Sequence, residues 1–128
     1  MPHVLVVDDD PVLADLVAFR LRRMGLEVTV ETDGESGLAA VHRLRPDLVV
    51  LDWLMPRMDG LEVCRALRAD GDPVLARTPV LMLTAKSQEP DLERGFAAGA
   101  TDFVTKPFST RELVSRVTAA LPPGSVPA

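Results

Sequence analysis

The sequence predicts an α/β domain in which helices cover both faces of a parallel β-sheet. Short apolar runs alternate with longer segments of helical periodicity, about five times along the chain. Several of the runs are rich in Val and Leu without polar alternation, which is typical of strands buried on both faces. The length of 128 residues suits one domain.

Each of the five apolar runs is an expected strand. They are HVLVVD (3–8), EVTVE (27–31), DLVVLD (47–52), PVLMLT (79–84) and TDFVTK (101–106). The first, third and fourth are the runs that lack alternation, so they are expected in the middle of the sheet.

Helices are expected between the strands. The first has an apolar stripe with three- and four-residue spacing, formed by Leu13, Leu16, Val17, Leu21 and Met24. Asp10 before Pro11 fits the start of this helix, Asp59 can cap a helix that begins near Gly60, and Ser109 can cap the last one. The glycines expected to end helices are Gly25, Gly71 and Gly99.

Composition excludes several functional classes. The net charge of −5 argues against a broad basic surface for nucleic acid. No stretch approaches the ~20 apolar residues of a membrane span, and the N-terminus does not read as a signal peptide, so a cytoplasmic location is expected. The single cysteine, Cys64, excludes an internal disulfide and fits a packing residue.

Polar side chains stand at the carboxyl ends of the expected strands. They are Asp8 and Asp9, Asp52, Thr84 and Lys106, from the first, third, fourth and fifth runs. Because the ends of parallel strands lie along one edge, three carboxylates, a hydroxyl and an ammonium are expected to converge. The ammonium would relieve the repulsion among neighbouring carboxylates.

One lysine does not balance three carboxylates, whereas a divalent cation would. A few hard oxygen ligands with room for water suit magnesium (Mg²⁺). Such an ion, beside an ammonium and a hydroxyl, suits the oxygens of a phosphoryl group. One of the carboxylates would then be a nucleophile that forms an acyl phosphate.

Four stretches of the chain resemble the receiver domain of bacterial two-component response regulators, over residues 3–121. They are VLVVDDD (4–10), DLVVLDWLMPRMDGLEV (47–63), PVLMLTA (79–85) and GATDFVTKPF (99–108). The resemblance implies a flavodoxin-like (βα)5 fold with strand order 2-1-3-4-5 and five flanking helices. It also implies a phosphoacceptor signalling domain rather than an enzyme.

The resemblance implies a role for each site residue. Asp52 corresponds to the phosphoacceptor, which takes the phosphoryl group from a sensor histidine kinase or a histidine phosphotransfer protein. Asp8 and Asp9, together with Asp52 and the backbone carbonyl of Leu54, correspond to the ligands of Mg²⁺. Lys106 corresponds to the lysine that pairs with the acceptor and then with the phosphoryl group.

The resemblance also implies a switch. Thr84 would move to bond a phosphoryl oxygen, and Phe103 would turn inward into the space that this vacates. The face formed by the fourth helix, strand 101–106 and the last helix would then change shape for an output domain or target protein. Burying the ring gives ~1.5–3 kcal/mol, enough to shift a two-state balance. Position 103 also suits a core residue, and the Lys106–Pro107 bond is implied to be cis.

Two features concern the lifetime of the acyl phosphate and dimerisation. Leu54 and Lys86 stand where related proteins tune hydrolysis, and the apolar Leu54 predicts a long-lived phosphoryl group. Charged pairs on the switching face join many DNA-binding relatives into homodimers. Such a set of charged residues is matched here by Asp102, Glu112 and Arg116. It is not matched at Leu92 and Ala97, which stand where charged partners would be expected. A homodimer therefore stays open.

Three alternatives compete with this interpretation. A phosphatase of the haloacid dehalogenase type would use Asp8 as nucleophile and Asp10 as acid/base, but it leaves DWLMPRMDG unexplained. A flavodoxin-type cofactor binder needs a phosphate loop of small residues, where DDDPV would repel phosphate. A receiver that binds partners without phosphorylation is the third.

The expected organisation is a receiver domain over residues 1–121 and a linker or disordered tail over residues 122–128, PPGSVPA. The domain itself is expected to bind neither nucleic acid nor membrane.

Overall fold

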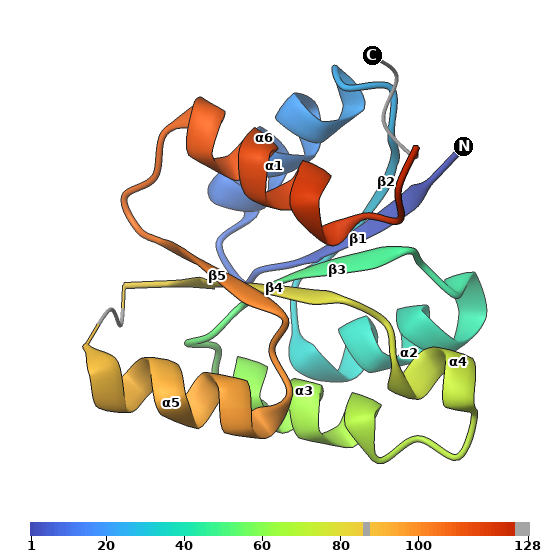
Figure 1. The fold of residues 1–128 in the computed structure, drawn as a ribbon, viewed down its shortest axis with the longest axis vertical. Coiled ribbons are helices and arrows are strands. Elements are labelled where there is room, and N and C mark those ends of the chain that lie inside the picture. The colour runs from blue at the N-terminus through green and yellow to red at the C-terminus, as the bar shows by residue number, and fades with distance from the viewer. Residues whose placement is uncertain (86–87, 125–128) are drawn as a thin grey trace.

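The structure is a computed structural model that describes residues 1–85 and 88–124. Five parallel strands form one sheet in the order β2-β1-β3-β4-β5, as predicted (Figure 1). They are β1 (His3–Val7), β2 (Glu27–Glu31), β3 (Leu48–Asp52), β4 (Val80–Thr84) and β5 (Asp102–Thr105). Their bounds agree with the expected runs to within one residue at each end.

The helices in the described part of the chain include one more than the five that were expected. They are α1 (Pro11–Arg22), α2 (Gly34–Leu44), α3 (Gly60–Arg68), α4 (Pro73–Ala76), α5 (Glu89–Ala98) and α6 (Thr110–Ala120). The additional helix, α4, is a single turn that starts at Pro73 behind an Asp72 cap. The fourth and last helices of the predicted fold are therefore α5 and α6.

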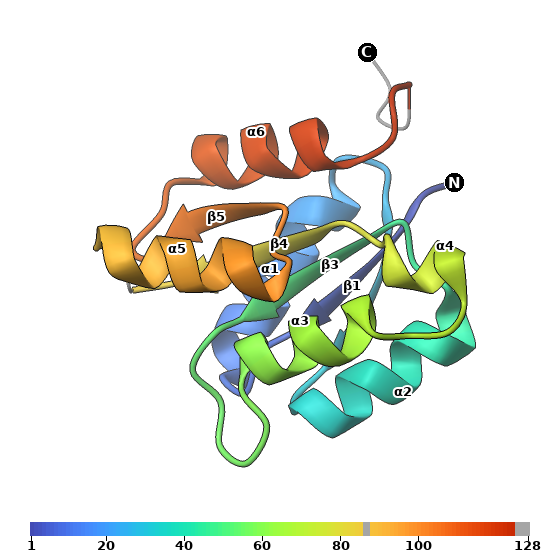
Figure 2. The same cartoon turned by 60° about the horizontal axis from the view of Figure 1, so that its bottom comes forward.

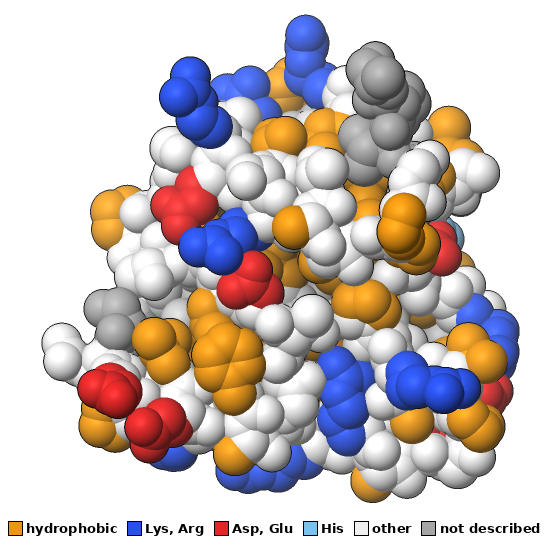
Figure 3. All heavy atoms as spheres, viewed as in Figure 1, with side chains coloured by type: hydrophobic (Ala, Val, Ile, Leu, Met, Phe, Trp, Pro, Cys, Tyr) orange, Lys and Arg blue, Asp and Glu red, His pale blue; other side chains and the backbone are white. Residues whose placement is uncertain are grey.

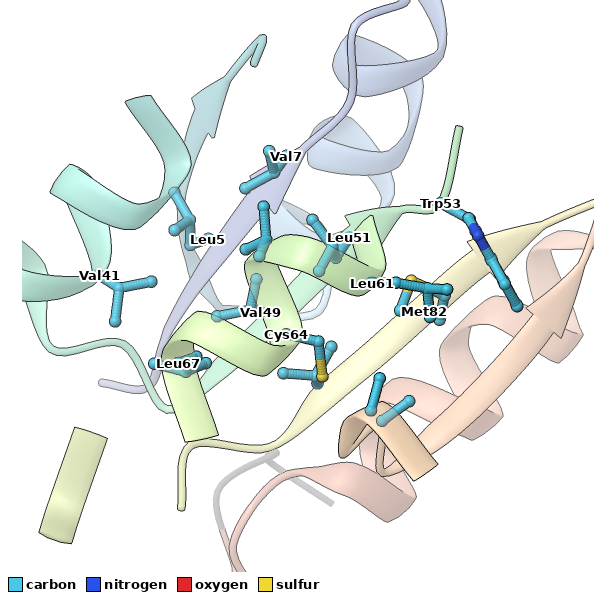
Figure 4. Packing of buried hydrophobic residues seen from close by; sticks show 14 of the residues in the cluster. Leu5, Val7, Val41, Val49, Leu51, Trp53, Leu61, Cys64, Leu67 and Met82 are labelled. Carbon is cyan, nitrogen blue, oxygen red and sulfur yellow. The ribbon is translucent and has the colours of Figure 1, made fainter. Parts of the chain in front are cut away.

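The helices form a layer on each face of the sheet. Helices α1 and α6 cover one face, and α2, α3, α4 and α5 cover the other (Figures 1 and 2). The side chains of β1 alternate between the two layers, so Val4 and Val6 pack beneath α1 and α6, whereas Leu5 and Val7 join the opposite core. Figure 4 shows this second core, in which Cys64 of α3 is buried as a packing residue.

Capping residues fix where helices begin. Asp10 accepts hydrogen bonds from the first turn of α1, and Asp59 forms a complete capping box with Glu62 at α3. At α6 the Ser109 side chain accepts one hydrogen bond, from the backbone N–H of Glu112. These predicted caps place the start of each of the three helices just beyond a strand end.

The carboxyl ends of the strands lie together at one end of the sheet. Helix α6 ends at the opposite end, where β1 begins (Figures 1 and 2). No helix within the two described ranges is long and apolar enough to cross a membrane.

Candidate functional site

Three carboxylates meet at the carboxyl end of the sheet. Asp8, Asp9 and Asp52 offer oxygens that all lie within 4.8 Å of one another. Asp8 directly follows β1 and Asp52 ends β3, and these strands are paired neighbours. Asp8 and Asp52 are buried and Asp9 is exposed, so the cluster opens to solvent on one side. The predicted convergence of the three carboxylates is confirmed.

Lys106 supplies the positive charge. It follows β5, and its backbone N–H donates to the carbonyl of Thr84 at 2.7 Å. Its Nζ donates to Asp52 Oδ1 at 3.0 Å and lies 3.9 Å from Asp8 Oδ2. The Lys106–Pro107 peptide bond is cis, as the resemblance implied. One ammonium thus faces two buried carboxylates.

The remaining predicted residues surround the cluster. Thr84 is buried at the end of β4, one residue beyond Leu83, which pairs with Asp52 in the sheet. Leu54 follows β3 and its side chain is 58% exposed. Phe103 lies in β5 and is buried. Lys86 lies outside the described residues.

Electrostatic repulsion and burial leave the carboxylates under-compensated. Burial raises the pKa of Asp52 to about 6, with a further contribution from the Asp8 carboxylate, although the bond from Lys106 opposes both effects. Burial also raises the pKa of Asp8, against the backbone N–H of Asp10 and the charge of Lys106. Asp52 is therefore mostly ionised at neutral pH, yet at a cost in free energy.

One oxygen of the cluster has an unmet bonding capacity. Asp8 Oδ1 accepts the backbone N–H of Asp10 at 2.9 Å. Its other oxygen, Asp8 Oδ2, is buried and has no hydrogen-bond partner among the described residues. A buried carboxylate oxygen in this condition is costly, and a divalent cation would satisfy it. The donor set, all carboxylate oxygen, fits Mg²⁺.

Asp10 does not belong to this cluster. Its side chain accepts the backbone N–H groups of Val12 and Leu13, and so it is committed to the start of α1. The phosphatase alternative needed Asp10 as acid/base beside a nucleophilic Asp8. That geometry is not present.

Gly60 is a site residue that the sequence analysis treated only as the start of a helix. Its N–H donates to the carbonyl of Trp53 at 2.8 Å. A Cβ at this position would stand 2.6 Å from the carbonyl oxygen of Asp52 and 2.9 Å from Sδ of Met82. The missing side chain lets α3 lie directly against the backbone of Asp52. The Asp-Gly pair at positions 59–60 indicated the start of a helix. The sequence did not indicate that this glycine would lie against the backbone of Asp52.

Comparisons with known proteins agree with this geometry. Residues 4–118 match the family described as response regulator receiver domain. The DNA-binding response regulator MtrA of Mycolicibacterium smegmatis is 49% identical over 119 residues, which cover 93% of this chain and 50% of MtrA. The chain thus spans about half the length of the curated relatives it matches.

Solved structures show the same fold. The chemotaxis protein CheY4 of Vibrio cholerae superposes with a TM-score of 0.88 at 34% identity, covering 94% of this chain and 99% of CheY4. The receiver domain of the sensor histidine kinase PA1611 from Pseudomonas aeruginosa has a TM-score of 0.83 at 31% identity and covers 93% and 96% of the two chains. That structure holds a magnesium ion in its active-site cleft.

These matches agree with the strand order and with the pocket of Asp8, Asp9, Asp52 and Lys106. They argue against a flavodoxin-type cofactor binder, because such a protein needs a phosphate loop after β1 and this chain has acidic residues there. The chain belongs to the receiver domains of two-component response regulators, which are phosphoacceptor signalling modules rather than enzymes in the usual sense.

Proposed function

We propose that Asp52 is the phosphoacceptor of this receiver. One of its carboxylate oxygens attacks the phosphorus of a phosphohistidine, the phosphorus–nitrogen bond breaks, and the imidazole leaves with the electron pair. The pKa of about 6 is compatible with this role, because the Asp52 carboxylate is more basic than that of an ordinary aspartate and is still mostly ionised at neutral pH. The observation that carries the proposal is the direct bond from Lys106 to a buried carboxylate that two further acidic residues surround.

Asp8, Asp9 and Asp52 would hold Mg²⁺, together with the backbone carbonyl of Leu54. When bound, this ion neutralises the charge that develops on the phosphoryl oxygens. The unsatisfied Oδ2 of Asp8 supports this assignment. The magnesium ion in the cleft of the related PA1611 receiver domain supports it as well.

Lys106 and Thr84 would then hold the phosphoryl oxygens. The Lys106 ammonium already lies at the acceptor oxygen, and Thr84 occupies the adjacent strand end. A phosphoryl group adds negative charge and strong acceptor oxygens at this point. Phe103, in β5 and in contact with Phe96 of α5, is the proposed residue through which the change reaches α5.

The responding surface is the face formed by α5, β5 and α6. Figure 3 shows hydrophobic side chains over α5 with acidic side chains beside them, and further charged side chains toward α6. Asp102 and Arg116 on this face form an ion pair within the chain, 3.2 Å between Oδ2 and Nη1. We propose that an output domain or target protein binds this face. The same face would also form the interface of a homodimer. The name of MtrA, a DNA-binding regulator twice as long as the match, supports an output domain joined through residues 122–128, beyond the receiver domain of residues 1–121.

An exposed apolar stripe on α1 marks where the phosphodonor would dock. Val12, Leu16 and Phe19 are 78%, 49% and 52% exposed, and their spacing of four and three residues puts them on one side of the helix. The assignment of Leu16 to the same apolar stripe as the buried Val17 and Leu21 was therefore wrong. The exposed stripe starts at the end of α1 that Asp10 caps, beside the pocket. A donor must cover the mouth of the pocket to reach Asp52, so its apolar surface would continue onto this stripe. We place this exchange in the cytoplasm.

Labelling with radioactive acetyl phosphate tests the acceptor. Wild-type protein with Mg²⁺ should incorporate phosphate at Asp52, and Asp52→Asn should lose it. Asp10→Asn is the matched control, because asparagine also caps helices and should preserve labelling. Label on Asp8, or loss of label in Asp10→Asn, would contradict the proposal and favour the phosphatase chemistry.

Phosphotransfer from a panel of purified histidine kinases tests the docking stripe. Leu16→Asp should slow transfer from the cognate kinase by at least about tenfold, the effect of ~1.4 kcal/mol of lost apolar contact. Labelling by acetyl phosphate should remain at the wild-type rate, because a small donor does not use α1. Equal losses with both donors would remove the stripe from the proposal.

A further inference from the structure

The ring of Phe103 occupies a slot in the neighbouring helix α5. It is 8% exposed and packs edge-on against Phe96 of α5, with ring centroids 4.7 Å apart and an interplanar angle of 83°. Trp53 also lies near the ring, with centroids 6.3 Å apart. The ring is therefore close both to the residue after Asp52 and to a side chain of α5.

The slot exists because residue 95 is glycine. An ideal Cβ at Gly95 would stand 2.7 Å from Cε1 of Phe103 and closer still to Cζ. Such distances are shorter than real contacts of a Cβ atom, so the ring and a side chain at position 95 exclude each other. Glycine weakens the interior of a helix relative to alanine, and α5 runs from Glu89 to Ala98. A glycine at this interior position therefore has a packing role.

We propose that Gly95 is the positioning residue for Phe103: its missing side chain leaves a slot that holds the ring inward between Trp53 and Phe96. Any larger residue at position 95 turns the ring outward. The ring fills the slot while the Asp52 carboxylate is bonded directly to Lys106. The inward ring is thus compatible with an unmodified Asp52.

The path from the pocket to the surface is short. Trp53 follows Asp52 in the chain and is itself buried. Phe103 pairs with Met82 across the sheet and touches α5 at the slot. Phe96 then carries the contact to solvent, where it is exposed on α5. The regulatory part of this inference rests on the proposed function of Asp52, whereas the position of the ring does not.

Nuclear magnetic resonance tests the position of the ring directly. In the wild-type protein, nuclear Overhauser effects are expected between the Hζ and Hε protons of Phe103 and the Hα protons of Gly95. They should persist when beryllofluoride is bound at Asp52, because the slot at Gly95 already holds the ring. Their absence from the unmodified protein, or their loss with beryllofluoride, would overturn the proposal.

Variants test whether Gly95 is the cause. Gly95→Ala should shift the emission of the only tryptophan, Trp53, and lower the melting temperature. Gly71→Ala is the matched control, because no atom lies within 4 Å of a Cβ there, and it should leave both unchanged. An effect of Gly95→Ala no larger than that of Gly71→Ala would overturn the assignment.

Rescue separates positioning from general helix damage. Phe103→Leu removes the ring atoms that meet the added methyl group, so Gly95→Ala combined with Phe103→Leu should melt no lower than Phe103→Leu alone. Additive losses would overturn the proposal, and this comparison holds even where Gly95→Ala alone does not fold. Acetyl phosphate should label Asp52 in the wild type and in the double variant. Loss of label from both would refute the proposed function and leave the slot to be judged by the resonance data.

Discussion

Gly60 shows how a single missing side chain shapes the surroundings of Asp52, the proposed phosphoacceptor. The first turn of α3 lies against the backbone of Asp52 because nothing projects from position 60. The contact therefore involves the site as much as the helix.

Substitution of this glycine tests that contact. Gly60→Ala should destabilise the domain by about 1–3 kcal/mol, the range for forcing atoms into a packed interior, and should slow labelling of Asp52 by acetyl phosphate. Chemical denaturation and the labelling rate are the measurements. Gly71→Ala, which adds the same methyl group in open space, should match the wild type. An unchanged labelling rate in Gly60→Ala would show that the contact does not position Asp52.

Leu54 bears on how long the phosphoryl group survives. Its exposed side chain follows the acceptor strand and offers no polar atom to an attacking water. Leu54→Asn should shorten the half-life of the phosphorylated protein by about fivefold, the effect of one hydrogen bond of ~1 kcal/mol. Decay of radioactive label is the measurement, with Leu54→Met as the apolar control. Decay no slower in the parent than in Leu54→Asn would refute the predicted long lifetime.

Residues differ in how far their roles were predictable. Asp8, Asp52 and Lys106 were predicted to converge because each stands at a strand end, and parallel strands end together. The contacts of Gly60 and Gly95 were not predictable, because each depends on the distance to a distant segment rather than on any local pattern. Asp10 was correctly predicted as a cap because capping is a local interaction.

At the scale of elements, Arg68 joins three parts of the fold. Its Nε donates to the carbonyl of Gly99 at 3.0 Å, and its Nη1 donates to the carbonyls of Ala76 and Thr78 at 3.1 and 2.7 Å. One side chain of α3 thereby holds the end of α5 and the segment from α4 to β4. In the sequence it is only a basic residue near the end of a helix.

Removal of this side chain should loosen the base of α5. Arg68→Met keeps the aliphatic stem and loses the donors, which should cost about 1–3 kcal/mol because partly buried carbonyls lose their partners. Denaturation measures the loss, and faster hydrogen exchange at Gly99 and Ala100 locates it. Arg65→Met, on the exposed side of the same helix, is the control and should change neither.

The elements themselves followed the sequence closely, with one exception. The strands were predictable because continuous Val and Leu runs have few other uses in a chain of this length. Helix α4 was not predictable, because a four-residue turn has no periodicity to detect. Only its Asp72-Pro73 start carries a signal, and that pair is equally common in ordinary turns.

At the scale of the whole molecule, ionisation of the buried Asp52 carboxylate lowers the stability of the fold. The pKa of Asp52 is raised from 3.8 to about 6, so the folded protein binds this proton more tightly than the unfolded chain does. The stability that results is fully present below about pH 4 and is lost as the pH rises through about 6. At neutral pH most of this stability is lost.

This linkage predicts a pH-dependent response to magnesium. Without the ion, the melting temperature of the wild type should fall relative to that of Asp52→Asn as the pH rises from about 4 to 7. Mg²⁺ should raise the wild-type melting temperature more at about pH 7.5 than at about pH 5, because protons compete with the ion at low pH. Differential scanning calorimetry at several pH values is the measurement. An equal effect of Mg²⁺ at both pH values, or an unaltered pH profile in Asp52→Asn, would contradict it.

Helix α6 connects the two opposite ends of the sheet. This helix begins near the acidic pocket and finishes on the opposite rim of the sheet, where β1 starts (Figures 1 and 2). A domain joined after Leu121 would therefore lie at the end of the sheet opposite Asp52. A phosphodonor at the pocket and this joined domain would then occupy opposite ends of the molecule, so that neither blocks the other.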